Sequence, residues 1–359
     1  MQTLELPTDG TPYRWGVLHG ATFRADIHDI ADIRVRLARE IGEFKDADQV
    51  LRVARAHMPV LKAFDRALYS EIKGIAEGSG LSEAEIVVVN HYTDLRDIGR
   101  SHSDVDAYLT AHPAEGGGCS AIYADTPEGR LLGQTWDIHG SAMPFVAMLK
   151  IPEHVTDHGV VPASWVLTIT GCVGMAGINA DGVGVTINNL RSLDAQVGIM
   201  WPALVRRMLG ERTAKGAHDV LMEAPIGSGH HYLVADKDDV FGVETSGKLK
   251  RQVFADPSGT FIHTNHCLDP EIEAHSAVAP TSTTFTRYER LTADTATSPI
   301  GGVADLWERF GSVYTNLQAP TNPHGVRTCA TVLMDLAARR MWTVEDRVEP
   351  DMAALFEFP

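Results

Sequence analysis

The 359-residue sequence is poor in cysteine and lacks any paired cysteine motif. Its four cysteines, at positions 119, 172, 267 and 329, lie far apart, and no two of them form a Cys-x-x-Cys pair. The sequence therefore indicates neither a disulfide framework nor a zinc ribbon, and it favours a reducing compartment. We expect a cytoplasmic protein.

Positive charge and long apolar runs are also scarce. Lys and Arg number 31 against 47 Asp and Glu, and the formal net charge is -16. Such a chain repels a phosphate backbone on average, so we expect no nucleic-acid partner. The N-terminal residues lack the basic start and apolar run of a signal peptide, and no stretch reaches membrane-spanning length. We therefore expect no membrane partner.

The composition is otherwise that of a folded chain. Hydrophobic residues make up 44% and charged residues 22%, without a low-complexity tract. These proportions predict a substantial core and argue against disorder. Length alone allows one large α/β unit or two to three average domains.

Residues 25–97 carry a helical pattern, because apolar residues recur there at three- and four-residue steps. Pro59 should kink or divide one of these helices. Ser82 and Glu85 form a capping-box pattern that predicts the start of another. Residues 100–118 are polar and aperiodic, which is typical of an exposed linker.

Beyond residue 118 the pattern changes to short strands. Two apolar runs flank a turn that contains Pro and Gly, which predicts a hairpin from residue 120 that ends at Asp137. Several runs are apolar on both faces, as expected for sheets covered on both sides, so we predict an α+β sandwich of helices and antiparallel sheets. Further strands are predicted at 145–151, 165–170, 175–179, 183–189, 232–235, 240–245, 261–264, 328–335 and 340–344, and helices at 201–210, 214–222, 283–291 and 302–310.

Three glycines run directly into a cysteine that opens an apolar strand, in the order Gly116-Gly117-Gly118-Cys119. Glycine allows backbone conformations that a side chain forbids, so the Gly118 carbonyl could be presented to the thiol that follows it. Cleavage of this bond would give Cys119 a free α-amino group with a reference pKa of about 7.7 to 8.0, suited to act as a base. The alternative is a loop entering a strand, with Cys119 as a small buried residue.

A second cysteine chemistry would use a histidine base. His263 and His266 form the obvious cluster, but the residues around Cys119 do not resemble the local signatures of thiol proteases. Together with Cys267 these histidines lack an identifiable fourth ligand for tetrahedral zinc, so we expect no metal and interpret them as local supports. A thiol hydrolase that uses His263 without processing stays open as an alternative.

Six segments match the motifs of one enzyme family, and the similarity as a whole extends over nearly the whole chain. They are Glu71–Leu81, Asn90, Cys119–Tyr123, Gly133–Asp137, Gly177–Gly182 and Val183–Asn188. The chain thereby resembles the acyl-coenzyme A:6-aminopenicillanic acid acyltransferase family, also called isopenicillin N acyltransferase-like proteins or peptidase family C45. The resemblance implies an N-terminal-nucleophile hydrolase with a four-layer αββα sandwich, similar in site layout to bile salt hydrolases and penicillin V acylases.

The same resemblance implies a division of the chain. A precursor cut just before its cysteine would give a helical α-fragment of residues 1–118, which ends in a Gly-rich processing linker. The remainder, residues 119–359, would be the catalytic β-fragment, and the two fragments would stay packed together.

The resemblance also implies roles for single residues. Cys119 matches the nucleophile, which attacks first the Gly118 carbonyl and later a substrate acyl carbon. Asp137 matches an aspartate that accepts a hydrogen bond from the α-amino group, Asn265 an asparagine that donates to the oxyanion, and Arg327 an arginine that stabilises the thiolate. Without the resemblance, Asp137 is a turn residue, Asn265 a turn cap and Arg327 a surface residue.

One assignment involves two neighbours. The family places an asparagine at the end of the strand that contains Asn188 and Asn189. Adjacent strand residues point to opposite faces, and the sequence does not separate the two. We assign the catalytic role to Asn188.

The predicted function is that of an amidohydrolase or N-acyltransferase. Cys119 would take an acyl group from a small amide or thioester and pass it to water or to an amine. We expect no cofactor, although acyl-coenzyme A can serve as an acyl donor; the partners are a small-molecule amide or acyl donor, an amine acceptor and the two fragments of the precursor. The alternatives are the Cys/His thiol hydrolase that needs no processing and a catalytically silent binding protein with the same fold.

Overall fold

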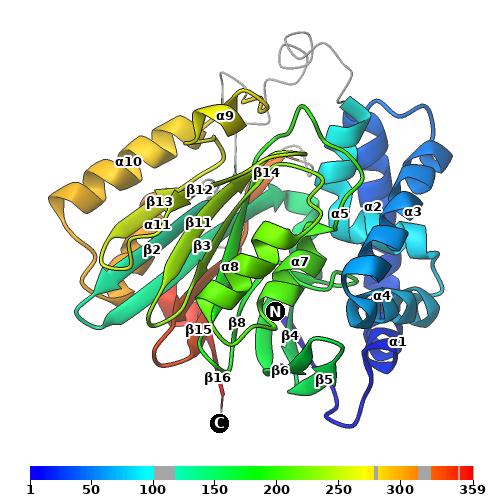
Figure 1. The fold of residues 1–359 in the computed structure, drawn as a ribbon, viewed down its shortest axis with the longest axis horizontal. Helices are drawn as coiled ribbons and strands as arrows, with labels where there is room; N and C mark the ends of the chain where they lie inside the picture. The colour runs from blue at the N-terminus through cyan, green and yellow to red at the C-terminus, as the bar shows by residue number, and fades with distance from the viewer. Residues whose placement is uncertain (101–117, 279–281, 314–324, 347, 359) are drawn as a thin grey trace.

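The computed structural model of the chain contains two stacked β-sheets with helices around them (Figure 1). A group of helices from the N-terminal part lies to one side of the sheets (Figure 1). Within the described residues, no helix combines the length and the apolar character needed to cross a membrane. The structure describes residues 1–100, 118–278, 282–313, 325–346 and 348–358, so most of the predicted linker at 100–118 lies outside it.

The two sheets pack face to face, with β2, β3, β14 and β15 of one sheet against β8 and β9 of the other. The larger sheet has the order β1 (Gln2–Glu5), β4 (Val146–Ile151), β7 (Ser164–Ile169), β8 (Ala176–Asn179), β9 (Gly184–Asn189), β10 (His230–Ala235), β11 (Val240–Thr245) and β12 (Lys250–Phe254). The smaller sheet has the order β13 (Thr260–His263), β2 (Ser120–Thr126), β3 (Gly129–His139), β14 (Val326–Asp335), β15 (Arg340–Glu345) and β16 (Ala354–Glu357). A separate hairpin joins β5 (His154–Thr156) and β6 (Gly159–Val161).

One pairing departs from the predicted antiparallel sheets. Strand β1 pairs with β4 in parallel, with Gln2 opposite Ala147. Parallel neighbours need a long connection, and here the whole helical region lies between the two strands in the sequence. The prediction of purely antiparallel sheets is therefore wrong at this edge.

Helices cover the outer faces of both sheets. Helix α8 contacts β10 and β11, whereas α10 and α11 contact β13, β3 and β14. Leu306 and Phe310 of α11 are fully buried in an apolar cluster with Ile122 and Leu333 of the smaller sheet. The four layers confirm the predicted αββα sandwich. The covering helices are α7 (Trp201–Met208), α8 (Ala214–Glu223), α10 (Thr284–Thr297) and α11 (Val303–Ser312), with shorter turns at α9 (Pro270–Glu273), η1 (Gly140–Phe145) and η2 (Pro350–Met352).

The helical region contains α1 (Pro12–Thr22), α2 (Arg24–Ile41), α3 (Ala47–Phe64), α4 (Arg66–Ser79) and α5 (Glu83–Arg100). The predicted capping box is confirmed, since Ser82 N donates to Glu85 Oε2 (2.7 Å) and Glu85 N to Ser82 Oγ (3.3 Å). The predicted division at Pro59 is wrong, because α3 runs through it while burying Met58 and Leu61 on its inner face.

Buried polar contacts join the helical region to the sandwich. Arg206 of α7 makes two 3.1 Å bonds to the carboxylate of Glu71 in α4. Asn90 of α5 donates to Gly171 O (2.9 Å) and accepts from Val173 N (2.9 Å). Since buried polar groups need partners, these contacts fix how α4 and α5 lie on the sheets.

The sequence analysis missed the elements at the ends of the chain and at the sheet edges. These are α1, β1, the β5–β6 hairpin, α9, β12 and β16. Most of them are short or lie at an edge, where one face is solvated and the apolar signal is weak.

Candidate active site

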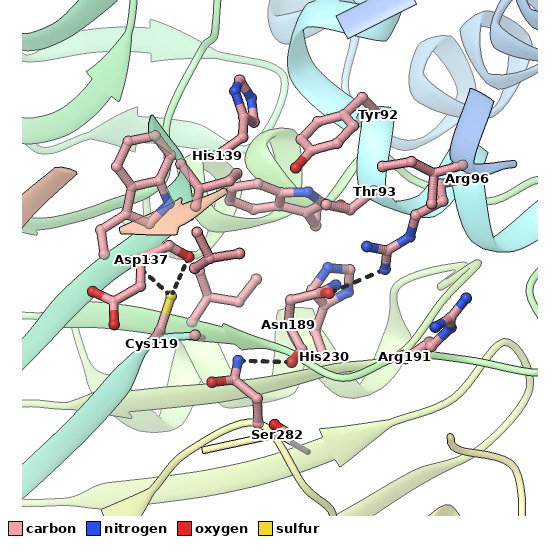
Figure 2. Close-up of a pocket in the computed structure, with 18 of the residues that line it drawn as sticks. Tyr92, Thr93, Arg96, Cys119, Asp137, His139, Asn189, Arg191, His230 and Ser282 are labelled. Atoms are coloured by element: carbon pink, nitrogen blue, oxygen red, sulfur yellow. Dashed lines mark hydrogen bonds between the residues drawn. The ribbon is translucent and has the colours of Figure 1, made fainter. Parts of the chain in front are cut away.

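Cys119 lies directly before β2 and faces the backbone of β3. The pairing of Ser120 with Thr135 sets the register that brings it there. Asp137 N donates to Cys119 Sγ (3.4 Å), and the thiol donates to Asp137 O (3.8 Å), as Figure 2 shows. The cysteine is 6% exposed and contributes to the wall of a cavity. The sheet pairing thus holds the thiol at the edge of a pocket.

The thiol is protonated in the continuous chain at neutral pH. Burial raises the pKa of Cys119 to about 12, and the charge of Asp137 acts in the same direction. Hydrogen bonds with the backbone of Asp137 and the side chain of Gln134, and the nearby Arg287 guanidinium, oppose this rise but do not cancel it. A thiol in this state needs a base before it can attack a carbonyl.

Gly118 lies against the side chain of Asn265. A Cβ atom added to Gly118 would be 2.2 Å from Asn265 Oδ1 and 2.6 Å from its Cγ. Only glycine fits this close approach without displacing the asparagine. Gly118 is therefore held against the Asn265 amide, directly before the residue whose thiol contacts Asp137.

Arg287 of α10 is a cation that contacts the backbone of Cys119, and the sequence analysis did not select it. Its Nη1 donates to Cys119 O (2.8 Å) and Ser120 Oγ (2.9 Å), and its Nη2 to Asn265 Oδ1 (3.1 Å). The residue is 4% exposed. Nothing in the sequence of the predicted helix 283–291 distinguishes it from Arg290, so only the fold identifies it.

Arg327 lies elsewhere. Its Nη2 forms an ion pair with Asp346 Oδ1, and the residue pairs with Ile138 across the sheet. Its charge acts on the pKa of Cys329, whereas the arginine that lowers the pKa of Cys119 is Arg287. We therefore replace Arg327 by Arg287 as the proposed cation for the thiol.

The structure separates the two asparagines at the end of β9. Asn188 is fully buried, its Nδ2 donates to Cys119 O (3.1 Å), and its Oδ1 lies 3.1 Å from His231 Nδ1. Asn189 lines the pocket, and its backbone O accepts from Asn265 Nδ2 (2.9 Å). Asn188 thus contacts the backbone carbonyl of Cys119, whereas the backbone carbonyl of Asn189 binds the Asn265 amide.

Gln134 was also missed, although it lies in a matched segment. Its side-chain amide accepts from Ile187 N (2.9 Å) and donates to Ile187 O (2.5 Å), which joins the two sheets. Its position inside an apolar strand run is the signal that could have identified it, because a buried glutamine needs hydrogen-bond partners.

The histidine cluster does not reach the thiol. The ring nitrogens of His263 contact Glu244 Oε1 (2.7 Å) and Thr264 O (2.8 Å), and the ring stacks on His231 at 3.7 Å. His266 contacts Thr264 and Thr284. In the part of the chain that the structure describes, no group of His, Cys, Asp and Glu side chains is arranged to hold a metal ion.

The pocket beside Cys119 encloses about 190 Å³ and has walls from both parts of the molecule. The sandwich contributes the apolar Trp136, Ile138 and Val326 and the polar Asn189, Arg191 and His230. Figure 2 shows Asn189, Arg191 and His230 together on one side of Cys119. The helical region contributes Leu37, Ile41, Tyr92, Thr93 and Arg96.

The two-sheet αββα sandwich is the fold of the N-terminal-nucleophile hydrolases. A solved conjugated bile acid hydrolase from Clostridium perfringens has this fold too, with a TM-score of 0.50 and 11% sequence identity over 67% of this chain and 92% of that one. The similarity between this hydrolase and the chain is one of fold.

Sequence comparison then gives the family. The family model described as acyl-coenzyme A:6-aminopenicillanic acid acyl-transferase matches residues 124–349. A curated relative, the acyl-coenzyme A:6-aminopenicillanic-acid-acyltransferase 40 kDa form of Emericella nidulans, is 27% identical over 292 residues, which cover 80% of this chain and 76% of the relative. The chain belongs to the acyl-coenzyme A:6-aminopenicillanic acid acyl-transferase family.

Proposed function

We propose that this protein is a self-processing cysteine amidohydrolase or N-acyltransferase that cuts its own chain between Gly118 and Cys119. The observation that carries the proposal is the position of this peptide bond. The Cys119 thiol lies at a pocket, and the preceding glycine is pressed against Asn265. The α-fragment would be residues 1–118 and the β-fragment residues 119–359.

Processing would begin with attack of Cys119 Sγ on the Gly118 carbonyl carbon. The peptide C–N bond breaks, its nitrogen takes up the thiol proton and becomes the α-amino group of Cys119, and a thioester forms. Water then hydrolyses the thioester and frees the thiol. Asn265 is the proposed donor to the oxyanion, because its amide lies next to the attacked residue.

Turnover would use the same groups with a new base. The free α-amino group, with a reference pKa of about 7.7 to 8.0, can take the thiol proton at neutral pH. Asp137 would accept a hydrogen bond from this amino group. Arg287 and Asn188 would fix the nucleophile by holding the Cys119 carbonyl at 2.8 and 3.1 Å.

The pocket lining supports an apolar acyl group, since Trp136, Ile138 and Val326 line the pocket and the first two flank Asp137, whose backbone contacts the thiol. The curated relative is named for acyl-coenzyme A and 6-aminopenicillanic acid. From this we propose acyl transfer between a thioester or amide donor and either an amine or water. Acyl-coenzyme A is a candidate donor.

Rapid-quench mass spectrometry on the purified protein tests the covalent route. With hexanoyl p-nitroanilide or the hexanoyl thioester of thiophenol as donor, we expect a hexanoyl adduct on Cys119 before steady state is reached. Added butylamine should divert product from hexanoate to hexanoyl butylamide without changing the acylation rate. Turnover of a donor without any adduct on Cys119 would contradict the proposal.

A further inference from the structure

We propose that His230 determines substrate specificity by accepting a hydrogen bond from an N–H or O–H group on the amine part of the substrate, and that Asp94 of the helical region positions it. This inference rests on the proposed function, which supplies the reaction that takes place in the pocket. The geometry of the two side chains is independent of it.

Asp94 is a buried carboxylate that accepts one side-chain hydrogen bond and has two imidazole nitrogens within ion-pair distance. His230 Nε2 lies 3.3 Å from its Oδ1, His91 Nδ1 lies 3.5 Å from its Oδ2, and Thr93 Oγ1 donates to Oδ1 (3.1 Å). Asp94 and His230 are 1% and 3% exposed. A buried carboxylate can only accept hydrogen bonds when ionised, so it needs these donors.

Asp94 is ionised at neutral pH. Its burial acts to raise the pKa, but His230 and His91 outweigh this effect, and the pKa falls to about 2. An ionised carboxylate selects the imidazole tautomer that carries its proton on the nitrogen facing it. In the proposed arrangement, the Nε2 that faces Asp94 Oδ1 at 3.3 Å carries the proton of the His230 ring.

The other ring nitrogen of His230 is then an acceptor. Among the described residues, none forms a hydrogen bond with His230 Nδ1; the contacts of this residue are the Asp94 pair, a bond from its backbone N to Thr245 Oγ1 (3.0 Å), and ring contacts with Trp201 and Tyr232. The residue lines the pocket. A buried acceptor in a pocket wall favours a ligand that brings a hydrogen-bond donor.

The position of His230 indicates which part of the substrate it meets. Trp136 and Ile138 line the pocket on either side of Asp137, whose backbone contacts the thiol, whereas His230 and Asn189 lie to one side of Cys119 (Figure 2). An acyl group bound beside Cys119 would direct the amine part of an amide toward this polar wall. The hydrogen-bond donor is therefore expected on the amine part.

A kink in α5 makes the contact between the two regions. His91 has a non-helical backbone (φ -138°, ψ 22°) inside this helix. Tyr92, Thr93 and Arg96, which follow the kink, line the pocket, while Asp94 contacts His230. The helical region thus positions a pocket residue of the sandwich.

A series of hexanamides tests the proposal on the processed protein. The probes are N-butylhexanamide and the N-(ω-hydroxyalkyl)hexanamides with alkyl chains of three to five carbons. We expect the best hydroxyl-bearing amide to have a KM roughly two- to tenfold below that of N-butylhexanamide, which corresponds to one hydrogen bond. The variant His230→Gln keeps a nitrogen at the Nε2 position but removes Nδ1, so the ratio of the two KM values should fall to about one.

Three further measurements separate this role from a structural one. His230→Asn can place its amide oxygen, a hydrogen-bond acceptor, near the Nδ1 position and loses the contact with Asp94, so it should retain part of the preference but lower the thermal stability. In Asp94→Asn, nitrogen-15 NMR should show His230 as a mixture of tautomers, whereas the unmodified protein should show the Nε2–H form. His218→Gln, which lies outside the pocket beside Phe241, is the matched control and should keep the KM ratio.

The outcomes are distinct. A KM ratio that is the same in the unmodified protein and in His230→Gln, or an Nδ1–H tautomer of His230, would overturn the role of His230. If Cys119 forms a hexanoyl adduct in the same samples, the proposed function stands even when the role of His230 fails. If no adduct forms, the proposed function fails instead.

Discussion

The helical region and the sandwich contribute different things to the same pocket. Cys119, Asp137, Asn188, Asn265 and Arg287, which carry the proposed chemistry, all belong to the sandwich. The helical region contributes only parts of the pocket wall and the carboxylate that faces His230. Changes in the sandwich should therefore impair self-cleavage and turnover together, whereas changes in the helices should alter substrate binding alone.

The largest expected effect comes from the nucleophile. Cys119→Ala removes the only group that we propose to attack either carbonyl, so both self-cleavage and hexanoyl p-nitroanilide hydrolysis should be lost completely. Gel analysis and release of p-nitroaniline measure the two. Cys329→Ala is the control, because this cysteine is fully buried outside the pocket lining. Hydrolysis of the anilide by Cys119→Ala would contradict the assignment of the chemistry to the sandwich.

The second prediction concerns the pH dependence of the thiol. A pKa of about 12, compared with an ordinary value of 9.0, leaves roughly a thousandfold less thiolate at pH 8 in the uncut chain. Alkylation of Cys119 by iodoacetamide in uncut protein should be slow at neutral pH and rise tenfold per pH unit toward pH 12. In the cut protein, the alkylation rate of Cys119 should instead rise with its midpoint near the pKa of the α-amino group. Equal profiles for the two forms would contradict the proposed change of base.

Gly118→Ala should slow self-cleavage by roughly a hundredfold. The added Cβ would lie 2.2 Å from Asn265 Oδ1 and must displace either the scissile bond or the asparagine, and a shift of about 1 Å is enough for such a loss. This variant also provides the uncut chain for the alkylation test. Gly311→Ala is the matched control, since a Cβ there meets no atom within 4 Å. Gel electrophoresis over time measures the cleavage rates. Equal rates in Gly118→Ala and the unmodified protein would show that the close approach of Gly118 to Asn265 does not matter for self-cleavage.

A pair of arginine variants tests which cation serves the thiol. Arg287→Met removes charged hydrogen bonds to Cys119 O, Ser120 Oγ and Asn265 Oδ1, so kcat should fall about 10- to 100-fold. Arg327→Met removes an ion pair with Asp346 and should change kcat by less than threefold. The reverse order in steady-state kinetics would restore the assignment made from the sequence.

The smallest effect is expected in the helical region. Ile41→Ala shortens a side chain of the pocket wall and should raise KM for hexanoyl p-nitroanilide severalfold, with self-cleavage unaffected. Leu18→Ala, an exposed position on α1, is the control and should leave both unchanged. A self-cleavage defect in Ile41→Ala would show that the helices take part in the chemistry.

Much of the fold follows from the sequence, because its signals are local. Apolar periodicity predicts α2 to α5, and alternation or fully apolar runs predict most strands of both sheets. Strands at sheet edges, such as β12 and β16, escape because they are short and only partly buried. The continuation of helix α3 through Pro59 was also not predicted. There the packing of the helix against its neighbours outweighs the local preference of proline to end a helix.

The same distinction between local sequence signals and tertiary packing applies to the residues of the site. Cys119 and its glycines are recognisable because they are adjacent in the chain, and Asn188, the asparagine chosen from the motif match, donates to the backbone carbonyl of Cys119. Arg287 and Arg327 differ only in where α10 and β14 place them, which no local pattern records. The contact between Asp94 and His230 depends on the kink at His91 and on the packing of two distant segments.

The central claim is that the bond between Gly118 and Cys119 breaks to create the catalytic base. The intact mass of the purified protein under denaturing conditions, with sequencing of each new N-terminus, tests it directly. We predict two fragments, residues 1–118 and 119–359, which copurify, with Cys119 at the N-terminus of the second. A single chain of 39.0 kDa that still turns over an acyl donor would contradict the account.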